Sequence, residues 1–156
     1  MKLTRQADYG ILLLAEMASG LPGVVHAAPD LATATGLPLP MVAKTLKQLG
    51  REGLLESQRG ARGGYRLARP AADISLADVV IAVEGPIAMT ACTDGGTGDC
   101  GLEARCRVHH NWQKLNRVVI GALARVSLAE MIQAEPRRLV LLEELALPAV
   151  RPVGAP

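Results

Sequence analysis

The chain has 156 residues, which is long enough for one hydrophobic core and short for two. Its net charge of +2 is too small to indicate a nucleic-acid partner, and its aromatic content of 2% disfavours proteins that stack single-stranded bases on aromatic side chains. No stretch has the roughly eighteen apolar residues of a membrane span or the pattern of a signal peptide. We therefore expect a cytoplasmic protein without a membrane partner, in surroundings that keep thiols reduced.

The N-terminal part of the chain has the spacing of three helices. Apolar residues recur at helical intervals over residues 4–18, and residues 30–35 indicate a short second helix. A third helix is predicted from Pro40, a residue suited to the first helical position, to about Glu52. A short helix followed across a tight turn by a longer one is the arrangement of a helix-turn-helix.

The predicted third helix has two distinct faces. Val42, Leu46 and Leu49 recur at i, i+4 and i+7 and should pack inward. A basic side chain on a helix surface is usually only solvated, so the outer face does not establish DNA binding by itself. That outer face, which in a helix-turn-helix enters the major groove, comprises Met41, Lys44, Lys47, Gln48 and Arg51.

A basic hairpin is predicted directly after the third helix. Residues 54–58 and 65–68 indicate two strands, and the loop between them is rich in glycine and arginine. Residues 40–70 carry seven Lys or Arg and two Glu, whereas residues 71–106 carry six acids and one Arg. Two basic elements in the order of a winged helix predict binding to double-stranded DNA. The predicted contacts are Lys44, Lys47, Gln48, Arg51, Arg59 and Arg62.

The second half of the chain is predicted to be helical. Ser75 and Asp78 have capping-box spacing at the start of a short helix, and Ser127 and Glu130 repeat it. Between them, residues 107–125 form a candidate long helix. Its apolar stripe comprises Leu115, Val118, Val119, Ala122, Leu123 and Val126.

This long helix is expected to make a homodimer. A helix that projects from a small domain has little of its own chain to pack against, so pairing with its copy would cover the apolar stripe. Two-fold symmetry would then present two recognition helices to a palindromic operator. The alternative is a helix that folds back onto the core of its own domain.

All three cysteines lie in one segment, with the spacing Cys-x7-Cys-x5-Cys-x2-His between Cys92 and His109. The first interval is mostly Gly, Asp and Thr, which tolerate turns and can wrap around a bound group. Thiolates and imidazole are ligands of soft metals. Structural zinc sites usually contain a Cys-x2-4-Cys unit, which is absent here, so the wider intervals favour an iron-sulfur cluster over zinc.

Several short motifs stand out along the chain: Asp8-Tyr9-Gly10, Leu31-Ala32, Gly53-Leu54-Leu55-Glu56-Ser57, Arg59-Gly60, Gly63-Gly64-Tyr65-Arg66-Leu67-Ala68, Glu84-Gly85-Pro86 and the three cysteines. Together they resemble the Rrf2 family of bacterial transcription regulators, over about residues 1–132. The residues around 84–88 and Cys92 are most similar to regulators of the SUF iron-sulfur assembly system, with IscR and the nitric oxide sensor NsrR as nearby relatives.

The resemblance implies a mainly α fold with a small β-hairpin wing, a winged helix-turn-helix plus a long dimerisation helix, and a cluster whose state alters DNA affinity. Cys92, Cys100 and Cys106 match the cluster thiolates, and His109 matches the imidazole ligand of the IscR-like branch. In the nitric oxide branch an Asp of the other subunit, matched by Asp8, completes a 4Fe-4S cluster. We favour His109, which is three residues from Cys106, and a 2Fe-2S cluster, with 4Fe-4S as the alternative.

These expectations divide the chain into residues 1–70 (DNA-binding domain), 71–91 (linker helix), 92–110 (cluster-binding loop), 107–134 (dimerisation helices) and 135–156 (C-terminal tail, with a helical turn or two at 139–147). We predict that the protein represses SUF genes and that it is not an enzyme. One alternative is a nitric oxide or redox sensing repressor of the same family. Another is a cluster-free thiol switch that joins Cys92 to Cys100 or Cys106. A zinc-dependent enzyme is disfavoured because no general base accompanies the ligands.

Overall fold

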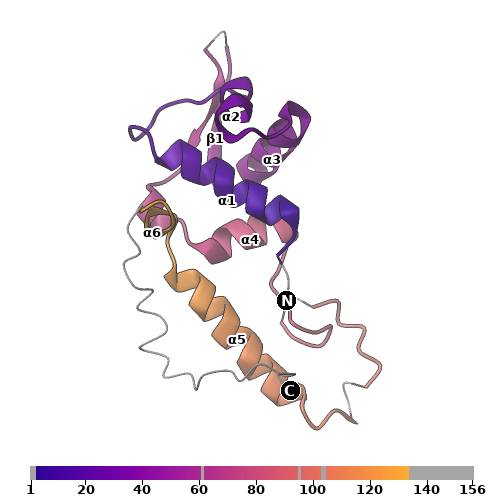
Figure 1. The fold of residues 1–156 in the computed structure, drawn as a ribbon. Helices are drawn as coiled ribbons and strands as arrows, with labels where there is room; N and C mark the ends of the chain where they lie inside the picture. Colours follow the sequence, from indigo (N-terminus) through magenta and orange to yellow (C-terminus); the bar gives the residue numbers. More distant parts are fainter. Residues whose placement is uncertain (1–2, 61, 95, 103–104, 134–156) are drawn as a thin grey trace, which may run out of the picture.

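The structure, a computed structural model, describes residues 3–60, 62–94, 96–102 and 105–133. α5 (His109–Arg125) extends away from the unit formed by the other helices and the hairpin, called the N-terminal unit (Figure 1). The fold is mainly α with one two-stranded hairpin, as predicted, and the predicted tail at 135–156 lies outside the described residues. In chain order the elements are α1 (Arg5–Ala18), α2 (Ala28–Thr35), α3 (Leu39–Arg51), β1 (Leu55–Gln58), β2 (Gly64–Leu67), the 3-10 helix η1 (Ala71–Asp73), α4 (Leu76–Glu84), α5 (His109–Arg125) and α6 (Leu128–Met131).

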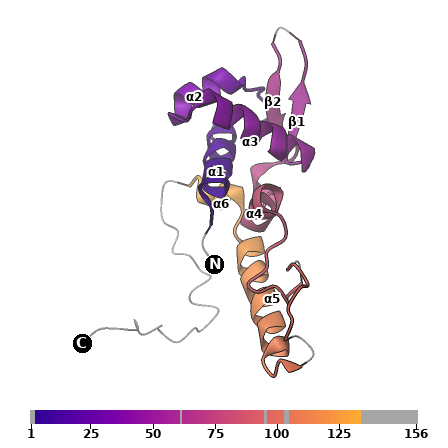
Figure 2. The ribbon, with the colours of Figure 1, turned by 90° about the vertical axis from the view of Figure 1, so that its right-hand side faces the viewer.

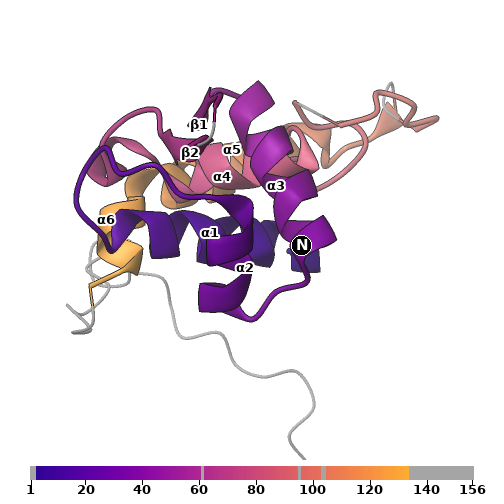
Figure 3. The same cartoon turned by 90° about the horizontal axis from the view of Figure 1, so that it is seen from above.

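The first helix, α1, lies at the centre of the N-terminal unit and packs against α2, α3, α4 and α6 (Figure 3). It begins where the sequence predicts, because Thr4 Oγ1 accepts a hydrogen bond from the Ala7 amide at 3.3 Å. This bond satisfies one of the free N–H groups of the first helical turn. Leu13 and Leu14 are fully buried, so α1 supplies much of the apolar core.

The predicted helix-turn-helix is formed by α2 and α3. α2 begins at Ala28 rather than at Asp30, because Pro29 is accommodated in the first turn of a helix. It ends at Gly36, whose φ of 70° is the left-handed conformation that glycine adopts most easily. α3 has its predicted bounds to within one residue. Its three inward residues, Val42, Leu46 and Leu49, are fully buried as predicted.

The hairpin pairs β1 with β2 in antiparallel register, with Glu56 opposite Arg66. These two side chains form an exposed ion pair at 2.7 Å. At the start of β2, His26 and Tyr65 exchange two backbone hydrogen bonds of 2.8 and 2.9 Å, which tie β2 to the segment before α2. Gly64 approaches that segment so closely that a Cβ atom on it would lie 2.3 Å from the His26 carbonyl oxygen. The predicted strands are confirmed to within one residue at each end.

Both predicted capping boxes are present. At the start of α4, the Ser75 side chain accepts a hydrogen bond from the Asp78 amide, and the Asp78 side chain accepts one from the Ser75 amide. Ser127 and Glu130 form the same pair of hydrogen bonds at the start of α6. The segments that precede these two helices are joined by two backbone hydrogen bonds of 2.8 Å. The far end of α5 is therefore fixed to the beginning of α4.

The long helix α5 begins at His109, two residues after the predicted start, and ends at Arg125 as predicted. Near its C-terminal end, Ile120 and Leu123 pack on a small apolar cluster formed by α4 and Ile87. The rest of α5 projects beyond the N-terminal unit rather than folding back along it (Figure 2). No helix of the described residues is long and apolar enough to cross a membrane.

The predicted apolar stripe of α5 is divided between two faces. Leu123 is turned toward α4, whereas Leu115 and Val118 are 43% and 51% exposed. Gly121 and Ala122 line a shallow depression beside Val118 on the same outer side. The projecting part of the helix therefore presents an open apolar face.

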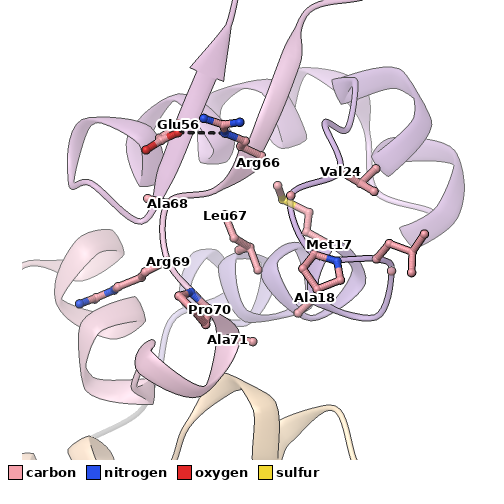
Figure 4. A pocket seen from close by; sticks show the side chains of 14 residues that line it. Met17, Ala18, Val24, Glu56, Arg66, Leu67, Ala68, Arg69, Pro70 and Ala71 are labelled. Carbon is pink, nitrogen blue, oxygen red and sulfur yellow. Dashed lines mark hydrogen bonds and ion pairs between the residues drawn. The ribbon is translucent and has the colours of Figure 1, made fainter.

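A hollow of about 530 Å³ lies beside the wing, between the end of α1, the loop that follows it and β2 (Figure 4). Its apolar walls include Met17, Val24 and Leu67, and the Glu56–Arg66 ion pair lies at its margin. None of the residues predicted to bind DNA or a cluster lines this hollow.

Candidate DNA interface and cysteine loop

The predicted DNA-contacting residues lie on α3 and the wing, at the end of the molecule opposite the projecting start of α5 (Figure 2). All of them except Gln48 are exposed, and within the described residues none of these five cations forms an ion pair. Their charge is therefore available to phosphate groups. The exposed set is Lys44, Lys47 and Arg51 on α3, with Arg59 and Arg62 in the loop between β1 and β2.

Gln48 differs from the prediction that placed it on the outer face of α3. Its Nε2 donates to the carbonyl oxygens of Ala82 and Val83 in the last turn of α4, at 3.0 and 2.9 Å. Its Oε1 accepts a hydrogen bond from Gln6 Nε2 at 2.8 Å. The outer placement was wrong because these free backbone carbonyls attract the amide toward α4.

Cys92 is the innermost of the three cysteines, with only 8% of its surface exposed, while Cys100 and Cys106 are half-buried. A hydrogen bond with the Thr90 hydroxyl, together with the nearby His109 and Cys100 side chains, lowers the pKa of the Cys92 thiol, and burial opposes this effect. The loop therefore brings two thiols and one imidazole together. Cys106 is linked to this group through the backbone, since its carbonyl accepts from the His109 amide at 3.3 Å.

The donor set fits a soft metal or an iron-sulfur cluster by its chemistry, because all three thiols are free and one imidazole lies beside them. In the described part of the chain, no group of three or more His, Cys, Asp or Glu side chains is arranged to hold a metal ion. The Cys92, Cys100 and His109 side chains are therefore neighbours without the arrangement of a complete metal site.

Two amide side chains of α5 hold the Cys92 segment, and the sequence reasoning missed both. Gln113 donates to the Cys92 carbonyl at 2.9 Å and accepts from the Asp94 amide at 3.2 Å. Asn116 is fully buried, donates to the carbonyls of Ile87 and Asp94 at 3.1 and 3.3 Å, and accepts from the Met89 amide at 2.9 Å. Two amides three residues apart on the helix beside a cysteine loop are the sequence signal that could have identified them.

The alternative ligand Asp8 and the second histidine of the pair, His110, are solvent-exposed. Asp8 is exposed in the first turn of α1. His110 is exposed, unlike its neighbour His109, which is half-buried. Of His109 and His110, it is therefore His109 whose imidazole lies beside the Cys92 thiol.

Comparison with known proteins decides the family. The model of the Rrf2 family, described as an iron-dependent transcriptional regulator, matches residues 3–134. The chain belongs to the Rrf2 family. The resemblance noted in the sequence is thereby confirmed, and the protein is a DNA-binding transcriptional regulator rather than an enzyme.

Known proteins match most of the chain. Protein aau3 of Rhizobium meliloti is 33% identical over 88% of this chain and 88% of its own length. The regulator IscR of Vibrio vulnificus is 30% identical over 85% of this chain and 77% of its own. The solved structure of CymR, the global cysteine regulator of B. subtilis, matches with a TM-score of 0.65 at 22% identity, over 86% of this chain and 98% of its own. The CymR likeness supports the Rrf2 winged-helix fold.

Proposed function

We propose that this Rrf2 regulator is a cytoplasmic, homodimeric repressor of SUF iron-sulfur assembly genes, and that a cluster in its cysteine loop sets its affinity for DNA. The observation that carries the proposal is the position of the Cys92 thiol, which lies beside Cys100 and His109 in a loop attached to both α4 and α5. The choice of SUF genes rests on the residues around 84–88 and Cys92, and the similarity to IscR supports a transcriptional regulator.

The proposed ligands are Cys92, Cys100, Cys106 and His109, with a 2Fe-2S cluster preferred over 4Fe-4S. A bound cluster would supply a redox-active group that is lost when iron or sulfide is scarce. The lowered pKa of Cys92 favours the thiolate that iron requires. The bond that Gln113 donates to the Cys92 carbonyl and the bond that Asn116 accepts from the Met89 amide hold the backbone of the Cys92 segment.

DNA contact is assigned to Lys44, Lys47, Arg51, Arg59 and Arg62, which are all exposed cations on α3 and the wing. Gln48 is omitted because its amide is occupied by Gln6 and α4. Dimerisation is assigned to the open face of α5, since burying Leu115 and Val118 against a second copy removes apolar surface from water. Two copies of α3 would then meet a palindromic operator.

The experiment that tests the proposal is anaerobic purification followed by a visible spectrum and by iron and sulfide analysis. We expect iron and sulfide in equal amounts, and we expect Cys92→Ser, Cys100→Ser and Cys106→Ser each to abolish the colour. Asp8→Ala would leave the spectrum unchanged if His109 is the fourth ligand and would alter it if Asp8 of the partner subunit completes an NsrR-like cluster. Colourless protein without iron or sulfide would refute cluster dependence.

A second candidate function, a cluster-free thiol switch, is favoured by one observation. Cys92 and Cys100 are close enough for the Cys100 thiol to contribute to lowering the pKa of Cys92. Hydrogen peroxide could accept two electrons from this pair, so that an S–S bond forms, the O–O bond breaks and two water molecules are released. Mass spectrometry after peroxide treatment of metal-free protein would detect the loss of two hydrogens, and operator binding would change with it.

A further inference from the structure

The last turn of α4 lacks the N–H groups that would normally satisfy its carbonyl oxygens. In a continuing helix the Ala82 carbonyl would accept from residue 86, but that residue is Pro86, which has no N–H. Gly85, with a φ of 87°, ends the helix and donates to Ile81. The carbonyls of Ala82 and Val83 instead accept from a side chain of α3, the Gln48 amide.

Gln48 is held at both ends of its amide. Its nitrogen bonds to α4 at 2.9 and 3.0 Å, and its oxygen accepts from Gln6 of α1 at 2.8 Å. A side chain that makes three hydrogen bonds to two other helices cannot move independently of them. Because Gln48 belongs to α3, the orientation of the recognition helix is tied to the end of α4.

The end of α4 is in turn tied to the cysteine loop. Ile87, three residues after the last residue of α4, is buried and its carbonyl accepts from Asn116 Nδ2 at 3.1 Å. The same Asn116 and its neighbour Gln113 hold the backbone from Met89 to Asp94, which includes Cys92. The connected path therefore runs from the Cys92 segment through α5 and the end of α4 to Gln48.

We infer that Gln48 is a positioning residue that couples the cysteine loop to the recognition helix. When the loop shifts, the last turn of α4 shifts with Ile87, and the two hydrogen bonds from Gln48 carry this displacement to α3. The coupling belongs to the chain itself and does not depend on what the loop binds. It extends the proposed function, because it names the contact through which any change at the cysteines would alter DNA affinity.

The test is a double-mutant cycle on metal-free protein, with binding measured to the DNA duplex that the wild type selects from a random pool. Gln113→Ala loosens the Cys92 segment, and Gln48→Met keeps the side-chain length but removes the donor to α4. In the wild-type background we expect Gln113→Ala to change the operator Kd about three- to tenfold, the range of moderate coupling between distant sites. In the Gln48→Met background we expect the same substitution to change Kd less than about twofold, the limit of additivity.

Lys47→Met is the matched control, because it places the same side chain on the exposed face of α3 and leaves the hydrogen bonds from Gln48 to α4 in place. Its own operator Kd should rise, because Lys47 is a proposed phosphate contact. Gln113→Ala should keep its full effect in that background. Equal effects of Gln113→Ala with and without Gln48 would overturn the inference, as would no effect of Gln113→Ala in either background. Asn116→Ala, run in parallel, provides a second perturbation of the loop with the same expected pattern. Because the cycle uses metal-free protein, a result that contradicts the coupling would leave the cluster proposal untouched. The iron and sulfide analysis tests the cluster proposal independently.

Discussion

The side-chain nitrogen of Gln113 lies 2.9 Å from the carbonyl oxygen of Cys92 and donates a hydrogen bond to it. Gln113 therefore joins the start of α5, the helix with the open apolar face, to the most buried cysteine of the chain. One turn further along, Asn116 adds three more bonds to the same segment. The loop that carries the cysteines is thus attached to its helix by amide side chains as well as by chain connectivity.

Replacing Asn116 with leucine should destabilise the protein strongly. The substitution leaves the Met89 amide and the carbonyls of Ile87 and Asp94 without their partner in a fully buried position. We expect the free energy of unfolding to fall by about 2–4 kcal/mol, given that an unsatisfied buried group costs about 1–3 kcal/mol. Urea denaturation measures the change. Asn111→Leu, an exposed position on the same helix, is the control and should alter stability by less than about 0.5 kcal/mol.

Replacing Arg59 with alanine should weaken operator binding and flatten its dependence on salt. Arg59 is exposed in the wing loop and forms no ion pair within the described residues, so its charge is available to a phosphate. Losing one phosphate contact should reduce the slope of log K against log salt by about 0.9. Binding titrations at several salt concentrations measure this slope.

Arg69→Ala is the control for the wing arginine, because Arg69 pairs with Asp78 at 2.9 Å and lies at the foot of the hairpin. Its salt slope should equal that of the wild type. An Arg59 variant with an unchanged slope would remove the wing loop from the DNA interface.

The sequence predicted the elements whose signals are local. Helix α4 needs only Ser75 and Asp78 to define its start, and the buried face of α3 follows from the spacing of Val42, Leu46 and Leu49. The wing likewise follows from two short strand patterns joined by a loop rich in glycine and arginine. In each of these cases the residues that decide the structure lie within a few positions of one another.

Gln48 and Asn116 could not be placed from the sequence, because their partners are backbone groups far along the chain. Gln48 bonds to carbonyls 34 and 35 residues away, and Asn116 bonds to groups 22 to 29 residues away. Periodicity puts a polar side chain on the outside of a helix by default. Only the tertiary approach of α4 and the cysteine loop creates the unsatisfied groups that draw these amides inward.

Thr90 should control the reactivity of Cys92. The Thr90 hydroxyl lies 3.4 Å from Cys92 Sγ and is the largest cause of the lowered pKa of that thiol. A lowered pKa means that the reactive thiolate persists to more acidic pH than in an ordinary cysteine. Thr90→Val removes the hydroxyl and should therefore shift the pH profile of Cys92 alkylation to higher pH.

Alkylation of metal-free protein by iodoacetamide, followed by peptide mass spectrometry, would resolve the modification of Cys92 from that of the other two cysteines. Thr97→Val is the control, since Thr97 lies in the same loop and its hydroxyl contacts Asp99 rather than a cysteine. Thr97→Val should leave the Cys92 profile in place. A profile that does not move in Thr90→Val would show that the hydroxyl does not stabilise the thiolate.

Replacing Val118 with glutamate should separate the proposed dimer. Val118 is 51% exposed at the open face of α5, beside Leu115, and burying a carboxylate against a second copy would require removing its charge from water. We expect sedimentation or light scattering to give a dimer for the wild type and a monomer for the variant, with weaker binding to a palindromic operator. Ala124→Glu introduces the same charge at another exposed position of α5 and should remain dimeric. A Val118→Glu variant that stays dimeric would move the subunit contact away from this face of α5.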